Sequence, residues 1–172
     1  MPIRPIVLFP HPILKRVCDP ADPADPLAQA VANDLLDTLD SAPGVGIAAP
    51  QIGQPLRIAV VDATRSLRHA ASAQGRFVLL NPEIVRREGE QLFREGCLSI
   101  PEYTGKVRRT ARITVRARDL HGEPLEIISE GFEAVVFQHE LDHLDGVLFL
   151  DRIADLKTDL FRRKARDTKC QG

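Results

Sequence analysis

The sequence predicts an α+β fold in which antiparallel strands pack around a central metal-binding helix. Residues 112–118 alternate between polar and apolar types, which indicates a strand with one solvent-facing side. A helical period follows further on, since apolar residues and histidines recur at i, i+4, i+7 and i+11, at Phe132, Val136, His139 and His143. The chain of 172 residues contains no repeat and no linker, so we expect one domain over residues 1–172.

The composition excludes several classes of protein. Hydrophobic residues make up 44% of the chain and charged residues 27%, as in ordinary globular proteins. The net charge is −1, so the chain lacks the excess of positive charge that DNA-binding proteins use. No stretch approaches the roughly 18 consecutive apolar residues of a membrane span. Three scattered cysteines without a CxxC pair argue against a disulfide framework and for a reducing compartment. We therefore expect a soluble, cytoplasmic protein with no membrane or DNA partner, in which Cys18 and Cys170 have no chemical role.

The first quarter of the chain is predicted to contain one helix. The opening 25 residues are rich in proline, so we expect extended chain laid over the domain. The helix is predicted to begin at Asp25-Pro26, where Asp takes the N-cap and Pro the first helical position. Ala42-Pro43-Gly44 ends it. Its apolar stripe consists of Leu27, Val31, Leu35 and Leu39.

Short strands are predicted in the middle of the chain. Residues 57–62, 77–81 and 125–128 are apolar runs bounded by turn residues, as strands are. Asp119-Leu-His-Gly122 is the expected hairpin connection into the last of these strands. The segment between Arg65 and Arg76 is small and polar, so we expect a surface loop in which His69 is solvated.

The last part of the chain is predicted to be helical. The histidine-bearing helix begins at Gly131 and is expected to end at Asp145-Gly146. Residues 153–166 follow as a final amphipathic segment, with Ile153, Leu156 and Leu160 expected to face inward.

The sharpest chemical signal is the run His139-Glu140-Leu141-Asp142-His143. Histidines four residues apart on a helix project side by side, so both imidazoles can reach one ion. Glu140 adjoins the first histidine, which places its carboxylate near a water on that ion, as in the HExxH motif of metallohydrolases. The alternative from the same residues is a pair of core histidines that hydrogen-bond to the backbone.

The third ligand decides the class of metal site. A third histidine six residues after the second is excluded because position 149 is phenylalanine, and no glutamate occurs after position 140. Asp151 or Asp155 remains possible. Cys97, within EGCLS at 95–99, is the better candidate, since a thiolate binds a borderline-soft cation strongly and Gly96 lets the backbone come close. Cys97 with two histidines leaves a fourth position for water, which is typical of a catalytic site.

A third unusual segment is GVGIAAPQ at 44–51. Its small residues indicate a backbone that another group approaches closely, and it ends in Gln51, whose amide can donate hydrogen bonds. It lacks the Lys-Ser/Thr pair of a phosphate loop. The alternative is a plain connection between a helix and a strand.

Together these segments resemble the peptide deformylase family, whose members remove the formyl group from the N-terminal methionine of new bacterial and organellar proteins. The resemblance rests on GVGIAAPQ (44–51), EGCLS (95–99) and QHELDH (138–143), in the family's order. It extends to the further matches NPEI (81–84), SIPE (99–102) and LDHLDGVLF (141–149). It therefore implies one deformylase-like catalytic domain over the whole chain, acting on N-formyl-methionyl nascent peptides.

The resemblance implies a role for each residue of the metal motifs. The metal ligands, one ion per chain, would be Cys97, His139 and His143. The ion would be Fe²⁺ in the cell, with Zn²⁺, Ni²⁺ or Co²⁺ able to replace it. Glu140 would act as general base and acid, while Gln51 and the backbone N–H of Leu98 would hold the oxyanion.

The resemblance also implies a substrate site. Gly46 would pair with the substrate backbone, and Gly96 would allow a close approach. The methionine pocket would be lined by Val45, Phe93, Glu95, Phe132, Val135 and Val136. One departure concerns the peptide beyond methionine: many bacterial members carry an arginine two residues after the SIPE segment, where this chain has Tyr103-Thr104.

Two rival functions use the same residues differently. The first is a zinc peptidase in which an aspartate joins His139 and His143 as third ligand. The second is a non-catalytic module that contacts the ribosome through a basic C-terminal stretch, made of Arg162, Arg163, Lys164, Arg166 and Lys169. The alternative for that stretch is a solvated helix end, where cations are favourable to the helix dipole.

Overall fold

The structure is a computed structural model that describes residues 3–164. Its helices are α1 (Pro26–Ser41), α2 (Gly131–Leu144), α3 (Phe149–Arg152) and α4 (Leu156–Asp159). Its strands are β1 (Gly46–Ala48), β2 (Ile58–Asp62), β3 (Arg76–Cys97), β4 (Ile100–Arg118), β5 (Pro124–Glu130) and β6 (Leu160–Arg162). All pairings between these strands are antiparallel, in the order β1-β2-β3-β4-β5, and β6 pairs with β4. The predicted α+β class is confirmed.

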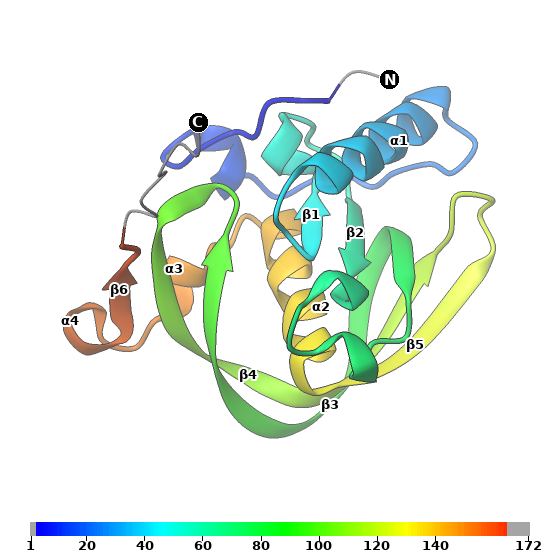
Figure 1. Ribbon diagram of the computed structural model, residues 1–172. Coiled ribbons are helices and arrows are strands. Elements are labelled where there is room, and N and C mark those ends of the chain that lie inside the picture. Colours follow the sequence, from blue (N-terminus) through cyan, green and yellow to red (C-terminus); the bar gives the residue numbers. More distant parts are fainter. Residues whose placement is uncertain (1–2, 165–172) are drawn as a thin grey trace, which may run out of the picture.

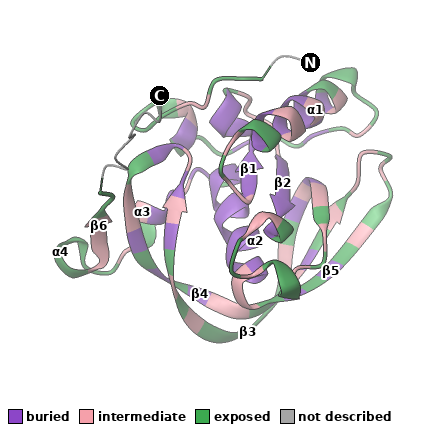
Figure 2. Cartoon of the chain, viewed as in Figure 1, coloured by how far each residue is buried: buried purple, intermediate pink, exposed green. Residues whose placement is uncertain are grey.

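Helix α2 lies at the centre of the molecule, between the short strands β1 and β2 and the long curved ribbons of β3 and β4 (Figure 1). Every residue from Glu133 to Leu144 is buried, so the helix is covered on all sides (Figure 2). The sequence predicted one inward face. The polar positions of the other face are buried too, because they form the site and its ion pairs.

The two long helices pack on opposite faces of strand β2. Ile58 and Val60 belong to the hydrophobic cluster that contains the buried face of α1. Val61 belongs to a second cluster, which contains Phe137 and other residues of α2. Alternate residues of a strand point to opposite faces, so one five-residue strand separates the two helices. Helix α2 therefore packs on one face of β2, and α1 covers the other.

Helix α1 begins as predicted, with one error in its apolar stripe. The Asp25 side chain accepts a hydrogen bond from the Leu27 N–H at 2.8 Å, and Pro26 occupies the first turn. Leu27 itself is 51% exposed, whereas Leu35 and Leu39 are fully buried. Steps of four residues turn a helix by about 40° more than a full turn, so Leu27 lies about 120° away from Leu39.

Strands β3 and β4 are much longer than the sequence indicated. The predicted run at 77–81 is the start of β3, and the predicted run at 112–118 is the end of β4. The intervening parts form a two-stranded ribbon whose residues from Arg86 to Glu90 are all exposed. The exposed residues of β3 need no apolar alternation, and the buried positions of β4 opposite the end of β3 include Gly105, Val107 and Arg109, which do not form an apolar pattern. Strand β5 and its Asp119–Gly122 turn agree with the prediction.

The segment after α2 differs from the amphipathic segment that was predicted. It forms α3, α4 and β6, and Leu156 is 58% exposed. Ile153 and Leu160 do pack against a hydrophobic cluster, as expected. The basic residues Arg166 and Lys169, like Cys170, lie outside the described residues. Within residues 3–164, no helix is both long enough and apolar enough to cross a bilayer.

The N-terminal segment runs over the domain in extended form as predicted, except for one turn of 3-10 helix at Pro12–Lys15. The Val7 N–H donates to the Gln51 carbonyl at 2.8 Å, and the Phe9 N–H donates to the Ser99 carbonyl at 2.9 Å. Both partners lie in motifs that carry candidate site residues. Cys18 is buried, and burial raises the pKa of its thiol to about 11, which fits the inert role expected for it.

Candidate metal centre

Three predicted ligands converge at the end of strand β3. The ligand atoms of Cys97, His139 and His143 all lie within 4.8 Å of one another, and all three side chains are at least nine-tenths buried. The Cys97 Sγ lies 3.3 Å from the His143 Nε2. The two imidazoles come from successive turns of α2, and their ring planes are 78° apart. Such a thiolate and two imidazoles match the donor set that binds Zn²⁺, Fe²⁺ and similar cations.

The aspartates considered as third ligand have other partners. Asp151 pairs with Lys15 and accepts a hydrogen bond from the Leu148 N–H. Asp155 caps α4 by accepting from the Lys157 N–H at 2.8 Å. Neither belongs to the group of potential metal ligands found among the described residues, so the site is not that of the rival zinc peptidase.

The charges in the site favour a cation. Burial alone would raise the pKa of the Cys97 thiol, but the charge of His143 and hydrogen bonds from His139 and His143 hold that pKa well below its usual range. Burial would likewise lower the pKa of His139, yet hydrogen bonds to Cys97 and Glu95 raise it well above its usual range. The lowered pKa leaves Cys97 as the thiolate that a metal ion needs, and a cation bound here would displace the proton from His139.

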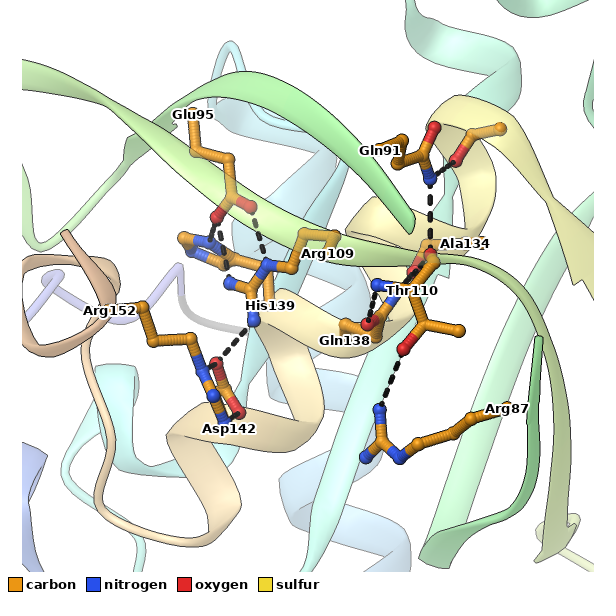
Figure 3. Close-up of polar contacts among 11 residues, drawn as sticks. Arg87, Gln91, Glu95, Arg109, Thr110, Ala134, Gln138, His139, Asp142 and Arg152 are labelled. Atoms are coloured by element: carbon orange, nitrogen blue, oxygen red, sulfur yellow. Dashed lines mark hydrogen bonds and ion pairs between the residues drawn. The ribbon is translucent and has the colours of Figure 1, made fainter. Parts of the chain in front are cut away.

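A buried network fixes the orientation of His139 (Figure 3). The His139 Nδ1 lies 2.8 Å from Glu95, which leaves Nε2 to face the other ligands. Both Glu95 oxygens also accept from Arg109, at 2.6 and 2.9 Å, and Arg109 donates to Asp142 at 2.6 Å. Asp142 is paired in turn with Arg152. Although burial opposes it, the hydrogen bonds from Arg109 and His139 lower the pKa of Glu95 to about 2.

Glu140 is the buried carboxyl group next to the ligands. Its burial, reinforced by the charges of Cys97 and Glu95, raises its pKa to about 7. Its Oε2 is one of two buried side-chain polar atoms without a hydrogen-bond partner in the described chain, the other being His143 Nδ1. Unpaired buried polar atoms are rare, and the unpaired Glu140 oxygen beside the candidate ligands marks a place for a missing group. A Cβ at Gly46 would lie 2.6 Å from the Glu140 Oε1, so only glycine fits there.

Gln51 is held in one orientation by its neighbours. Its Oε1 accepts from the Ala48 N–H at 2.9 Å, so its NH₂ group must point the opposite way. That group lies 3.2 Å from the Ser99 Oγ and 3.6 Å from the Cys97 Sγ. The amide is therefore a buried, preset donor beside the ligands.

A cavity of about 340 Å³ opens onto this group of side chains. All residues assigned to the substrate from the sequence line it, namely Val45, Gly46, Phe93, Glu95, Gly96, Phe132, Val135 and Val136. Gln51, Leu98 and Glu140 line it as well. The Glu95 carboxylate faces Arg109 and His139, so its ionic contacts lie behind the cavity wall.

Sequence reasoning missed several residues around the site. Arg109 is 4% exposed and forms the buried ion pairs, but in the sequence it is one of many arginines on a strand. His69 was expected to be solvated, yet its ring stacks on Phe132 with centroids 4.4 Å apart and meets Phe93 edge-on at 5.7 Å. Arg163, the residue after β6, also lines the cavity. Only its basic character was visible in the sequence.

The fold and the site together define a metal-dependent hydrolase: a buried thiolate and two imidazoles, a carboxyl group with a pKa near 7, and a cavity that opens on both. The family model for polypeptide deformylase matches residues 3–159. The chain therefore belongs to the peptide deformylase family, whose members remove the formyl group from the N-terminus of nascent proteins.

Individual relatives support this assignment. The chain is 43% identical over 172 residues to a peptide deformylase of Acidobacterium capsulatum, covering 100% of this chain and 99% of the relative. A solved peptide deformylase of Legionella pneumophila is 42% identical, with a TM-score of 0.82 over 91% of this chain and 89% of that one. A class I type b enzyme of Acinetobacter baumannii, solved with Met-Ala-Ser bound, is 33% identical, with a TM-score of 0.82 over 88% of this chain and 99% of that one.

Proposed function

We propose that Cys97, His139 and His143 bind one divalent cation, Fe²⁺ in the cell, and that Glu140 moves the proton when the formyl group is removed from formyl-methionine. The observation that carries the proposal is the meeting of these three ligand atoms within 4.8 Å, beside a cavity that Cys97 and His139 line. The thiolate-imidazole donor set also accepts Zn²⁺, Ni²⁺ or Co²⁺.

The bound cation and Glu140 have different roles in the hydrolysis. When bound, the cation supplies a Lewis acid that makes water nucleophilic near neutral pH. Glu140 accepts the proton of the attacking water and later delivers it to the departing amine, which a carboxyl group with a pKa near 7 can do in both directions. Formate and a free α-amino group are the products.

Two donors meet the negative charge that develops on the formyl oxygen. The Gln51 NH₂ group is already turned toward Cys97, so it needs no reorientation during the reaction. The backbone N–H of Leu98, the residue after the cysteine ligand, is the second donor. One preset donor of this kind lowers a reaction barrier by about 3 kcal/mol.

The substrate fits the cavity and the adjoining strand edge. Among the described residues β1 pairs only with β2, so the other edge of Gly46 is available to the substrate backbone. The methionine side chain occupies the apolar part of the cavity, which consists of Val45, Phe93, Phe132, Val135 and Val136. The Met-Ala-Ser bound to the Acinetobacter baumannii relative begins with the same residue.

The test combines elemental analysis of anaerobically purified protein with formate release from formyl-Met-Ala-Ser. We expect about one equivalent of metal, mostly iron, and formate production that ends when a chelator removes the metal. Formate release that persists without metal would exclude the proposed mechanism. Cleavage of internal peptide bonds in unformylated peptides would favour the rival peptidase.

We further propose that residues 1–172 act as one catalytic domain in the cytoplasm, where formylated nascent chains are made. A ribosome contact through the basic C-terminal stretch rests on charge alone, and Arg162 ends a strand, not a helix. Co-sedimentation with ribosomes tests this contact. Equal pelleting of the full chain and of a variant lacking residues 165–172 would exclude a role for that part of the stretch.

A further inference from the structure

Strand β6 brings the C-terminal part of the chain to the mouth of the cavity. It pairs antiparallel with β4, with Tyr103 opposite Arg162 and Gly105 opposite Leu160. The next residue, Arg163, continues this contact, because its N–H donates to the Glu102 carbonyl at 2.7 Å. The backbone of Arg163 is therefore fixed, and its side chain lines the cavity.

Gly96 makes room for the Arg163 side chain. The Arg163 Nη2 occupies the space that a Cβ at position 96 would need, so the guanidinium lies directly against the backbone next to Cys97. Gly96 was assigned to a close backbone approach, and the group that approaches is an arginine of the same chain. This contact places a cation one residue from a proposed metal ligand.

The Arg163 guanidinium is the cation at this mouth with no partner of its own. Among residues 3–164, no hydrogen bond or ion pair involves its side chain, and it is exposed to solvent. The other arginine that lines the cavity, Arg94, donates to the Thr104 hydroxyl at 2.9 Å and stacks over Phe161 at 4.1 Å. Of the two acidic residues in the lining, Glu95 is paired with Arg109 and Glu140 is buried beside the ligands.

We propose that Arg163 binds a carboxylate of the peptide substrate beyond methionine, so that the enzyme favours an acidic residue in the second position after methionine. A planar guanidinium with five donors matches a carboxylate geometrically. Neither of the two acids that line the cavity is free to pair with Arg163, and Arg94 adds to the local positive charge. This inference rests on the proposed function, because it assumes that formylated peptides enter this cavity with methionine first.

The experiment measures formate release from three peptide amides with Ala, Asp or Lys after formyl-Met-Ala. The amide ends remove the terminal carboxylate, so only the side chain differs; a fourth peptide, formyl-Met-Ala-Ala with a free carboxylate, tests that alternative source. For the unaltered enzyme we expect kcat/KM to be about three- to tenfold higher for Asp than for Lys, mainly through KM, as for a partly exposed charge pair. The ratio should fall between about 0.05 and 0.5 M salt.

The variants distinguish an effect of the Arg163 side chain from an effect of the positive charge of the whole segment. We expect R163Q to bring the Asp-to-Lys ratio close to one, whereas R163K retains part of it. The matched controls R162Q and K164Q remove the same charge from exposed neighbours and should keep the full ratio. An unchanged ratio in R163Q, or an equal loss in R162Q, would overturn the inference. Absence of formate from every peptide would instead contradict the proposed function, and equal turnover of all peptides would contradict the role of Arg163 alone.

Discussion

Cys97 and Glu140 are two buried acids of one site whose pKa values move in opposite directions. Two imidazoles face the Cys97 thiol and favour its thiolate, whereas burial dominates at Glu140 and favours the protonated carboxyl group. The HExxH spacing predicted the pairing of His139 with His143, because helix geometry alone brings them together. Nothing local predicted that Arg109 supports His139 through Glu95, since that contact joins residues 14 positions apart across two strands.

Replacement of Glu140 tests its role in proton transfer. We expect Glu140→Ala to keep the metal, because Glu140 is not one of the three converging ligands, and to lower kcat about 10²- to 10⁴-fold. Metal content and formate release would be measured on the same preparation. Glu123→Ala, at an exposed turn, is the control and should behave as the unaltered enzyme. A Glu140 variant with full metal and near-normal turnover would assign proton transfer to another group.

Replacement of Glu95 tests the support of His139. Glu95→Gln keeps the shape of the side chain but removes the charge that orients the imidazole. Partners of this kind raise the basicity of a ligand, and their loss weakens metal binding about 10- to 100-fold. Competition with a chromogenic chelator would measure that affinity, and circular dichroism would show whether the variant is folded. A folded Glu95→Gln protein with unaltered affinity would limit Glu95 to a structural role.

At the scale of elements, the sequence predicted the helices and strands that have an apolar pattern of their own. It missed the strands that form only because they pair with a neighbour. Helix α1 has apolar residues at helical spacing and strand β2 is a short apolar run, so both were predicted from the sequence. Strand β1 has three residues and, among the described residues, pairs with β2 alone, so its sequence resembles a plain connection. The loop between β2 and β3 was expected to be solvated, but it carries His69 onto the aromatic wall of the cavity. A single aromatic side chain is enough for such a contact, so a loop that is otherwise polar can make it.

His69 is expected to stabilise the wall of the methionine pocket. Its ring stacks on Phe132 and meets Phe93, and aromatic pairs of this kind contribute about 0.5–1.5 kcal/mol each. His69→Ala should therefore raise KM for formyl-methionyl peptides about two- to tenfold, while kcat changes little. Leu67→Ala, in the same loop but fully exposed, is the control. A fall in kcat at constant KM would show that the loop acts on the reacting groups instead.

At the scale of the whole molecule, the site and the fold share one set of ion pairs. Arg109 on β4 binds Glu95 on β3 and Asp142 on α2, and Arg152 of α3 extends the set through Asp142 (Figure 3). The central helix is thus tied to the ribbon that supplies Cys97. Contacts that join two strands and a helix depend on the complete topology, so the sequence alone indicated the candidate ligands but not the residues that support them.

The dependence of the fold on Arg109 can be measured directly. Arg109→Leu leaves the Glu95 and Asp142 carboxylates buried without their shared partner, and loss of one member of a buried pair costs about 3–5 kcal/mol. Urea unfolding in the presence of a chelator would isolate this effect from metal binding.

The matched control is Arg116→Leu, which breaks the exposed Arg116–Glu126 pair between β4 and β5 and should cost about 0.5 kcal/mol or less. The two variants lose the same charge from the same strand, so their difference reports burial. Equal losses of stability would mean that the buried pairs hold His139 in place without contributing to the fold, and then metal affinity alone would fall in Arg109→Leu.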